Sequence, residues 1–464
     1  MLRGTRNPHV PFVHSGSCVP CTLHLTFLAT FLFKLLNLHT AELYPTMHAP
    51  LPTPSPEAAQ HSVRLCESIR RDIAGQGGWI SFARYMELAL YAPGLGYYTA
   101  GAHKFGEAGD FITAPELSPL FGRTLARQMA QIMACSAPHI LELGAGSGKL
   151  AADLLGELER VGSLPDSYAI LEVSADLRAR QQTLLQERLP HLLERVHWLD
   201  TLPEKFSGAI VANEVLDALP VHLVHWRDSA LAERGVALNP DNPLDYPCIV
   251  GARPACESRP GAAPTGHLGS NGYEHGFVWQ EHSIANAALL HAAQQINVPG
   301  DYVSEICLAA RGLVSSLAGC LGQGALLFID YGFGAREFYH PQRSSGTLMC
   351  HYRHHAHGDP FFLPGLQDIT AHVNFTDIAE CGIDAGLELL GYTSQAFFLL
   401  NCGITELMKD TPPENLRDYL PLSAQLQKLT SPAEMGELFK VMALARGIAE
   451  PLCGFARGDL LRTL

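Results

Sequence analysis

The chain is poor in positive charge. Its 464 residues include 32 Lys and Arg against 46 Asp and Glu, which gives a formal net charge of −14 at pH 7. A protein that holds nucleic acid without sequence preference needs a basic face that releases counterions from the phosphates. The shortage of cations therefore argues against that class of function and favours a basic or neutral substrate.

Paired cysteine spacings and long apolar runs are also missing. The 12 Cys are scattered, and the lone Cys-x-x-Cys pair, Cys18 and Cys21, lies in a segment without clear structure. We therefore expect reduced thiols and no metal. The apolar run over residues 22–38 is interrupted by Lys34 and is marginal for a bilayer span, which takes about 20 residues. We expect no stable membrane insertion.

Residues 1–56 differ in composition from the rest of the chain. They are a segment upstream of a true start at Met47, a signal anchor or an organelle transit peptide. Arg3, Arg6 and the lack of acids before Glu42 favour the two targeting alternatives. We expect a disordered or wrongly included extension on a cytoplasmic protein. The alternative location is the mitochondrial matrix, if the segment is a transit peptide.

A glycine-rich turn follows the apolar residues 139–143. Gly144, Gly146 and Gly148 stand at alternate positions, and a helical pattern begins at Lys149. This strand, turn and helix is typical of a nucleotide pocket, because glycine lets the backbone turn tightly and approach a ligand. The third glycine comes one residue earlier than in the dinucleotide fingerprint. An ordinary tight turn remains the alternative.

A second apolar run, residues 168–173, ends in one carboxylate, Glu172. In nucleotide-binding α/β units an acid at the tip of the second strand, about 20 residues beyond the glycines, accepts hydrogen bonds from ribose hydroxyls. We expect Glu172 to bind the cofactor. The alternative is a solvated Glu at a strand end.

Alternating strand and helix patterns predict an α/β fold with a doubly wound, mostly parallel, Rossmann-like sheet. We expect strands near residues 139–143, 168–173, 196–199, 208–212, 325–330, 392–400 and 441–445. We expect helices over residues 58–74, 81–91, 120–133, 149–158, 175–189, 282–295, 302–321, 375–390 and 432–439. The expected parts are the extension 1–56, a helical region and cofactor lid 57–134, the first part of the core 135–239, an insertion 240–300, and the remaining core with the C-terminal region 301–464.

Two carboxylates follow the fourth expected strand. Asn213 stands at the strand end, and Glu214 and Asp217 are three residues apart, on one face if the segment is helical. Ligands bind at the carboxyl edge of such sheets. The alternative is a capping cluster at a helix start, with Asn213 as the cap.

Several motifs in matching order resemble the MidA family of class I methyltransferases, which includes the mitochondrial complex I assembly arginine methyltransferase. The resemblance covers about residues 60–450. The motifs lie at residues 109–116, 142–148, 213–220, 330–332 and 368–375. The resemblance implies S-adenosylmethionine as donor and, for mitochondrial members, a protein arginine as acceptor, with a respiratory complex subunit as one candidate partner. Asn374 stands where an Asp is expected from the family.

The resemblance also assigns roles. It implies that Glu142, two residues before the first glycine, and Asn213 help to bind the donor. It also implies a lid whose residues help to bind the donor. The lid residues are Asp110, Thr113, Pro115 and Glu116.

Methyl transfer to arginine brings two cations together, so Glu214 and Asp217 are expected to orient the guanidinium and offset its charge. His372 could take a proton from a neutral acceptor, and Asp330 could border the acceptor. A structural histidine and a turn aspartate are the alternatives. The histidine-rich run 350–357 is expected to be a basic, aromatic loop beside the acceptor.

Three other functions stay open. The chain could be a non-catalytic assembly or binding factor on the same core, a methyltransferase that acts on a small molecule, or a nicotinamide-dependent oxidoreductase. The early third glycine disfavours the oxidoreductase, and the intact Glu172 and Glu214 argue against a decayed site.

Overall fold

The computed structural model describes residues 51–100, 113–227, 230–240, 248–249, 273–274 and 276–464. Residues 1–50 of the expected extension, Asp110, and most of the stretch 240–276 that was expected to be a flexible excursion lie outside the described residues. None of the helices within the described ranges is long and apolar enough to cross a membrane.

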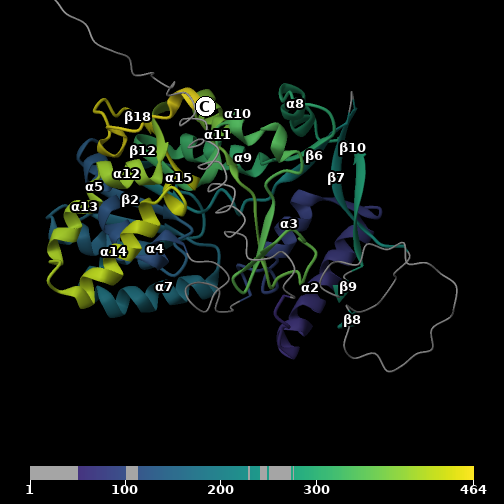
Figure 1. The fold of residues 1–464 in the computed structure, drawn as a ribbon, viewed down its shortest axis with the longest axis horizontal. Coiled ribbons are helices and arrows are strands. Elements are labelled where there is room, and N and C mark those ends of the chain that lie inside the picture. The colour runs from purple at the N-terminus through teal and green to yellow at the C-terminus, as the bar shows by residue number, and fades with distance from the viewer. Residues whose placement is uncertain (1–50, 101–112, 228–229, 241–247, 250–272, 275) are drawn as a thin grey trace, which may run out of the picture. The chain divides into compact units, whose positions relative to one another are not determined.

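The main sheet has the order β17-β18-β12-β5-β2-β3-β4, and β16 pairs with β12 (Figure 1). Its strands are β2 (His139–Leu143), β3 (Ser167–Leu171), β4 (Val196–Leu199), β5 (Phe206–Asn213), β12 (Leu321–Phe333), β16 (Val373–Asn374), β17 (Glu388–Ser394) and β18 (Phe439–Arg446). The strands β4, β3, β2, β5 and β12 are parallel, whereas β18 runs antiparallel to β12 and to β17. The expected α/β class is confirmed, and the sheet is mixed.

Side chains on alternate positions of these strands enter two different apolar cores. Ile140 and Val211 belong to one core, and Leu141 and Ile210 belong to the other. This is the period of two that a strand imposes, and burial on both sides explains the nearly continuous apolar runs of the parallel strands. The first core includes α5 (Pro119–Ala134), α6 (Lys149–Arg160) and α12 (Gln395–Asn401), and the second includes α9 (Leu308–Cys320) and α11 (Phe375–Asp384).

The remaining α-helices of this part include two longer helices, α7 (Ala175–Arg188) and α14 (Leu416–Thr430), and four short ones. The short ones are α4 (Ala114–Leu117), α10 (Ala335–Phe338), α13 (Ile404–Leu407) and α15 (Met435–Leu438).

A second, antiparallel sheet was not expected from the sequence. It has the order β1-β7-β6-β11, and β10 pairs with β7. Its strands are β1 (Trp79–Ser81), β6 (His222–Arg227), β7 (Ala230–Leu238), β10 (Phe277–Ser283) and β11 (Tyr302–Ile306). The helices α2 (Pro56–Gly75) and α3 (Phe82–Tyr91) share a core with Leu223 and Val236, whereas α8 (Ala287–Gln295) packs with Val224. Figure 1 shows α2 and α3 beside this sheet.

The small elements complete the description. The strands β13 (Met349–Tyr352), β14 (His355–His357) and β15 (Asp368–Thr370) form a three-stranded sheet, and β8 (Cys248–Ile249) pairs with β9 (Tyr273–Glu274).

Several secondary-structure predictions are wrong in part. The helix expected over residues 375–390 ends at Asp384, and β17 begins at Glu388. The helix expected over residues 302–321 is strand β11 followed by α9, because pairing of β11 with β6 outweighs the local helical pattern. The strand expected over residues 392–400 ends at Ser394, which caps α12. The helix expected over residues 282–295 begins only at Ala287, after β10. The division of the chain into the five expected parts stays a prediction.

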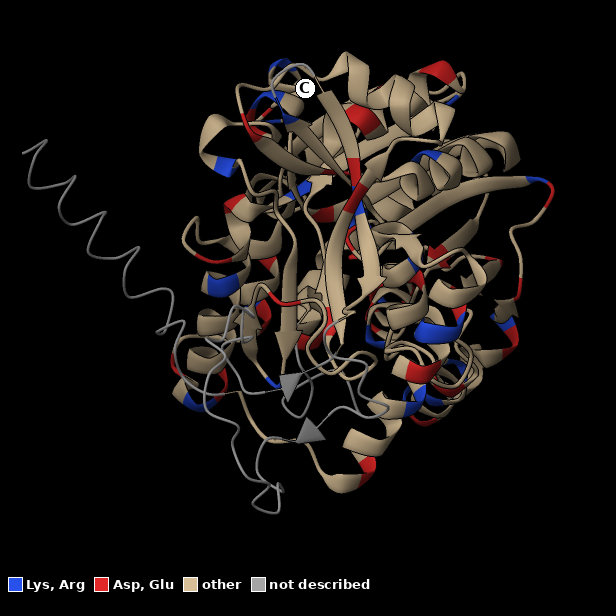
Figure 2. Cartoon of the chain, turned by 90° about the vertical axis from the view of Figure 1, so that its right-hand side faces the viewer, with Lys and Arg blue, Asp and Glu red and all other residues tan. Residues whose placement is uncertain are grey.

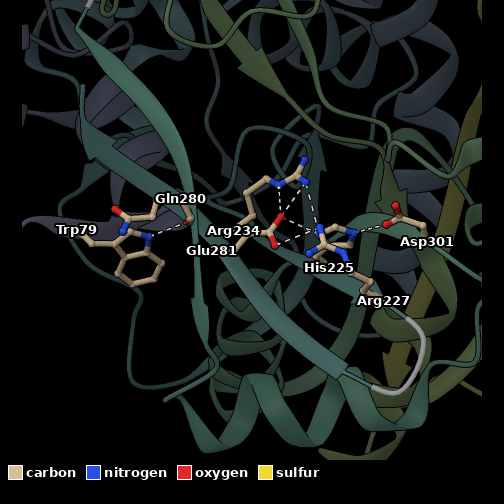
Figure 3. Close-up of polar contacts among 7 residues, drawn as sticks. All are labelled: Trp79, His225, Arg227, Arg234, Gln280, Glu281 and Asp301. Carbon is tan, nitrogen blue, oxygen red and sulfur yellow. Dashed lines mark hydrogen bonds and ion pairs between the residues drawn. The ribbon is translucent and has the colours of Figure 1, made fainter. Parts of the chain in front are cut away.

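A charged network centred on His225 links three strands of the second sheet (Figure 3). The imidazole is 3% exposed; its Nδ1 lies 2.7 Å from Oε1 of Glu281, and its Nε2 contacts Asp301. Arg234 donates to Glu281 at 2.9 Å. The network therefore ties β6 to β7, to β10 and to the residue before β11.

We expect His225→Phe to lower the free energy of unfolding by about 1–3 kcal/mol, since the ring volume is kept while hydrogen bonds to charged partners are lost. Urea denaturation of both proteins measures this. His291→Phe, on the exposed side of α8, is the matched control. Equal stability of His225→Phe and wild type would contradict a structural role of the network.

Candidate active site

The glycine turn has the geometry that its sequence predicts. Gly144, Gly146 and Gly148 have φ of 60°, 54° and 88°, a left-handed region that favours glycine. The amide of Gly144 donates to the carbonyl of Leu171 at 3.0 Å, so the turn is tied to the end of β3. A Cβ on Gly146 would meet no atom within 4 Å. At Gly146 the turn therefore exposes its backbone, without a side chain, to open space.

The turn borders a cavity of about 1120 Å³. The cavity also reaches the segment after α3, the ends of β3 and β5, and the small sheet of β13 and β15. The expected site residues that line it are Thr113, Pro115, Glu116, Glu142, Gly144, Gly146, Glu172, Asn213, Glu214 and Asp217. Gly148 instead forms the cap of α6.

Glu172 is held in a fixed position at the end of β3. Its Oε1 accepts from the amide of Ser174 at 2.9 Å and its Oε2 from Nε2 of Gln181 at 3.0 Å. Burial raises the pKa of this carboxyl. Gln181 also donates to the carbonyl of Gly146 at 2.9 Å and accepts from Trp198 at 2.9 Å. Gln181 therefore links the turn to the carboxylate, a role that its place in the middle of α7 did not reveal.

Glu142 lies inside β2 and is 2% exposed. Its Oε2 accepts from the hydroxyl of Tyr168 at 2.7 Å, and burial raises the pKa of Glu142 to about 7. The carboxyl group therefore carries a proton in a large share of molecules at neutral pH.

The first turn of α4 is fastened to the glycine turn. Glu116 accepts from the hydroxyl of Ser147, and its Oε2 lies 2.8 Å from Nζ of Lys149. These contacts hold Thr113 and Pro115 at the cavity wall. The lid expected over residues 109–116 is thus described only from Thr113 onward.

The segment after β5 is a turn, not a helix, so the condition under which Glu214 and Asp217 would share a helical face is not met. Both nevertheless line the cavity. Glu214 has φ of 52°, which a residue with a Cβ rarely adopts. Its amide donates to the carbonyl of Ile329 at 2.8 Å, and this bond to β12 keeps the strained conformation.

Asp330 stabilises the same turn by accepting hydrogen bonds from its backbone amides. Its Oδ2 accepts from the amides of Leu216 and Asp217 at 3.0 and 3.2 Å. The hydroxyl of Tyr331 donates to Asp217. Asp330 is 1% exposed and is not among the residues that line the cavity. It therefore supports the turn and does not border the acceptor as expected.

Burial raises the pKa of all three carboxyl groups of this cluster. Burial raises the pKa of Asp217 to about 6. The pKa values of Glu214 and Asp330 lie well above the usual range, because repulsion from neighbouring carboxylates adds to the effect of burial. Figure 2 shows acidic positions in the central strands and in loops at their ends.

Three buried acceptor atoms of the turn lack a hydrogen-bond partner among the described residues. They are Oδ1 of Asn213, Oε2 of Glu214 and Oδ1 of Asp217. Buried polar atoms are nearly always hydrogen-bonded in folded proteins, and all three residues line the cavity. The arrangement fits a ligand with several N–H donors.

His372 is not brought to this cavity. It lines a separate cavity of about 680 Å³, and its ring stacks on Phe333 with centroids 5.2 Å apart. Burial lowers the pKa of His372 to about 4. We therefore correct its expected role as a base beside the acceptor: the imidazole packs behind β12. From the histidine-rich run, His351 does line the cavity.

Comparisons with known proteins agree with this geometry. The sequence pattern of the family described as "Putative S-adenosyl-L-methionine-dependent methyltransferase" matches residues 120–393, more than half of the chain. The chain therefore belongs to this family, and S-adenosylmethionine is its cofactor. The resemblance to MidA methyltransferases is confirmed.

Individual relatives support the assignment. The "Protein arginine methyltransferase NDUFAF7, mitochondrial" of Danio rerio is 29% identical over 398 residues, which cover 79% of this chain and 83% of the relative. The human protein of that name is 29% identical and covers 79% and 80%. A crystal structure from Burkholderia thailandensis, described as "a COG1565 superfamily member and likely methyl transferase" bound to S-adenosylhomocysteine, has 48% sequence identity to this chain. The two structures match with a TM-score of 0.80, over 89% of this chain and 100% of that one.

The expected cytoplasmic location is contradicted by these comparisons. The curated relatives from fish, fly and cattle are all named mitochondrial.

We expect Gly146→Val to weaken donor affinity at least tenfold, because a branched side chain would enter the cavity and φ of 54° would be strained. Titration with S-adenosylhomocysteine measures the change. Gly162→Val is the matched control, since Gly162 also has positive φ, 71°, but lies in an exposed turn after α6. Unchanged affinity in Gly146→Val would refute the placement of the donor at this turn.

Proposed function

We propose that this protein transfers the methyl group of S-adenosylmethionine to an arginine side chain of another protein. The observation that carries the proposal is the group of three unpartnered acceptor atoms on Asn213, Glu214 and Asp217. A guanidinium has five N–H donors in one plane and suits such a group. The name of the relatives, protein arginine methyltransferase, supports the same acceptor.

The donor half of the cavity is formed by the glycine turn and the end of β3. We propose that Gly144, Gly146 and Gly148 shape the backbone around the donor and that Glu172 accepts from its ribose hydroxyls. Thr113, Pro115, Glu116, Glu142 and Asn213 would complete this half, and Asp110 is expected to join them. The strand order of the main sheet supports a Rossmann-like, doubly wound architecture for this part.

The charge of the cavity wall suits a cationic acceptor. Its acidic residues are Glu87, Glu116, Glu142, Glu172, Asp176, Glu214, Asp217 and Asp368. Its only Lys and Arg in the described part of the chain, Lys149 and Arg84, are paired with Glu116 and with Asp72 and Glu87. The wall therefore carries more acidic than basic groups, and the carboxyl groups that ionise when the acceptor binds can offset two neighbouring cations. The volume of about 1120 Å³ also leaves room for a peptide beside the donor.

The chemistry requires positioning more than covalent participation. When bound, the donor supplies an electrophilic methyl group on a positively charged sulfur. Glu214 and Asp217 would hold one guanidinium nitrogen in line with that methyl group. As the new C–N bond forms, the C–S bond breaks and its electron pair stays on sulfur. One of the two carboxylates would accept the proton that the nitrogen loses.

We expect Glu214→Gln to lower the methylation rate at least a hundredfold, about 2.7 kcal/mol of lost transition-state stabilisation. The amide keeps the shape of the side chain, so the affinity for S-adenosylhomocysteine should stay within about twofold. Single-turnover assays and titrations of both proteins test this, with the exposed Glu414→Gln as control. The acceptor is first found by labelling a lysate, and respiratory complex subunits are one candidate class. Normal rates in Glu214→Gln would contradict the mechanism.

The same variant has a second expected effect. Because the folded pKa of Glu214 lies above its usual 4.5, the wild-type protein loses stability as pH rises from about that value through the folded pKa. Glu214→Gln removes this loss. Its melting temperature should exceed that of wild type by a margin that widens with pH. A constant difference from pH 4 to pH 8 would show that Glu214 is not a strained buried acid.

Acceptor binding should also depend on pH. A guanidinium favours the ionised form of Asp217, whose pKa is about 6 without the acceptor, so binding should release protons and tighten as pH rises through that value. We expect the KM for acceptor to fall severalfold between pH 5 and pH 7.5. Asp217→Asn should flatten the profile. A KM that is independent of pH in wild type would contradict this linkage.

A further inference from the structure

One part of the cavity wall lies beside the turn of Glu214 and Asp217 and has no individual role in the mechanism above. It consists of Tyr91, the last residue of α3, Tyr98 in the segment after α3, and Asp368 at the start of β15. All three line the same cavity as Glu214 and Asp217. The general acidity of the wall does not explain why this carboxylate is combined with two aromatic rings.

The wall is held at both ends by hydrogen bonds. The hydroxyl of Tyr98 donates to Oδ1 of Asp368 at 2.9 Å, and the amide of Ile369 donates to the same oxygen at 3.0 Å. The ring of Tyr98 stacks on Tyr91, with centroids 5.5 Å apart. The hydroxyl of Tyr91 donates to the carbonyl of Ala218, next to Asp217, at 3.0 Å. The two tyrosines thus connect Asp368 to the turn that carries the expected acceptor carboxylates.

Asp368 also acts on that turn electrostatically. It is 7% exposed, and its negative charge contributes to the raised pKa of Tyr91 and of Glu214. Such an effect requires that the groups lie close together in a poorly solvated space. A third carboxylate therefore belongs to the same negatively charged part of the cavity.

We infer that Asp368, with Tyr91 and Tyr98, forms a specificity subsite that selects a guanidinium over an ammonium group. This inference rests on the proposed arginine function. A guanidinium is planar and delocalised, so it stacks on aromatic faces while its edge donates to carboxylates on more than one side. An ammonium is a compact, strongly hydrated charge that gains less from such a wall. Asp368 would touch the substrate, and Tyr98 would position Asp368.

The test is Asp368→Asn, which removes the charge while its Oδ1 can still accept from Tyr98 and Ile369. The probes are two blocked tripeptides, Gly-Arg-Gly and Gly-Lys-Gly, titrated into protein loaded with S-adenosylhomocysteine. We expect wild type to prefer the arginine peptide, and Asp368→Asn to bind it about tenfold more weakly with unchanged affinity for S-adenosylhomocysteine. The preference over the lysine peptide should shrink accordingly.

Two further variants sharpen the result. Tyr98→Phe should weaken arginine binding less than Asp368→Asn does, because the carboxylate stays. Asp384→Asn, an exposed site at the end of α11, changes net charge equally and should have no effect.

The outcomes separate the two proposals. If wild type prefers the arginine peptide and Glu214→Gln stops transfer, but Asp368→Asn binds as wild type does, the subsite is overturned and the proposed function stands. If wild type does not discriminate between the peptides, the subsite is also overturned. The proposed function fails separately, if the mapped methyl group is not on arginine.

Discussion

The structure depends on carboxyl groups that are buried where two parallel strands end. Glu214 and Asp217 follow β5, and Asp330 lies near the end of β12. Their hydrogen bonds come from neutral donors: backbone amides, the Asn213 amide and the Tyr331 hydroxyl. Burying acids without a cation costs free energy. The cationic acceptor proposed above would relieve this cost for Glu214 and Asp217, which line the cavity.

The sheet is what keeps the acids in position. Parallel pairing of β5 with β2 and β12 brings the glycine turn and the acidic turn to one edge. The left-handed backbone of Glu214 is held by its bond to Ile329. Strain and raised pKa values therefore coincide in one turn, as is typical of functional sites, where stability is given up for reactivity.

The elements that could be predicted are those with strong local patterns. The parallel strands are buried on both faces, so β2, β3 and β5 read as apolar runs, and the three glycines mark a backbone that needs positive φ. The second sheet was missed because β7 and β10 are partly exposed and are paired across a long separation in sequence. For β11, a short apolar run did not distinguish strand from helix, and pairing with β6 decided it.

The site residues divide in the same way: those at strand ends could be predicted from the sequence, and those that depend on tertiary contacts could not. Glu172, Glu214 and Asp217 follow strand ends, so topology places them at the ligand edge. Gln181 contacts the glycine turn, and Asp368 lines the cavity, through tertiary contacts that no local spacing encodes. His372 was expected in the site because it lies in a family-like motif and an imidazole titrates near neutral pH, but its ring stacks on Phe333.

The most direct test of the central claim is to identify the residue that receives the methyl group. The protein is incubated with a lysate and donor carrying an isotopic label in its methyl group, and labelled proteins are digested and mapped by mass spectrometry. The account requires the label on guanidinium nitrogens of arginine, and its loss when Glu214→Gln replaces wild type. Label on lysine, on a carboxylate or only on small molecules would contradict it.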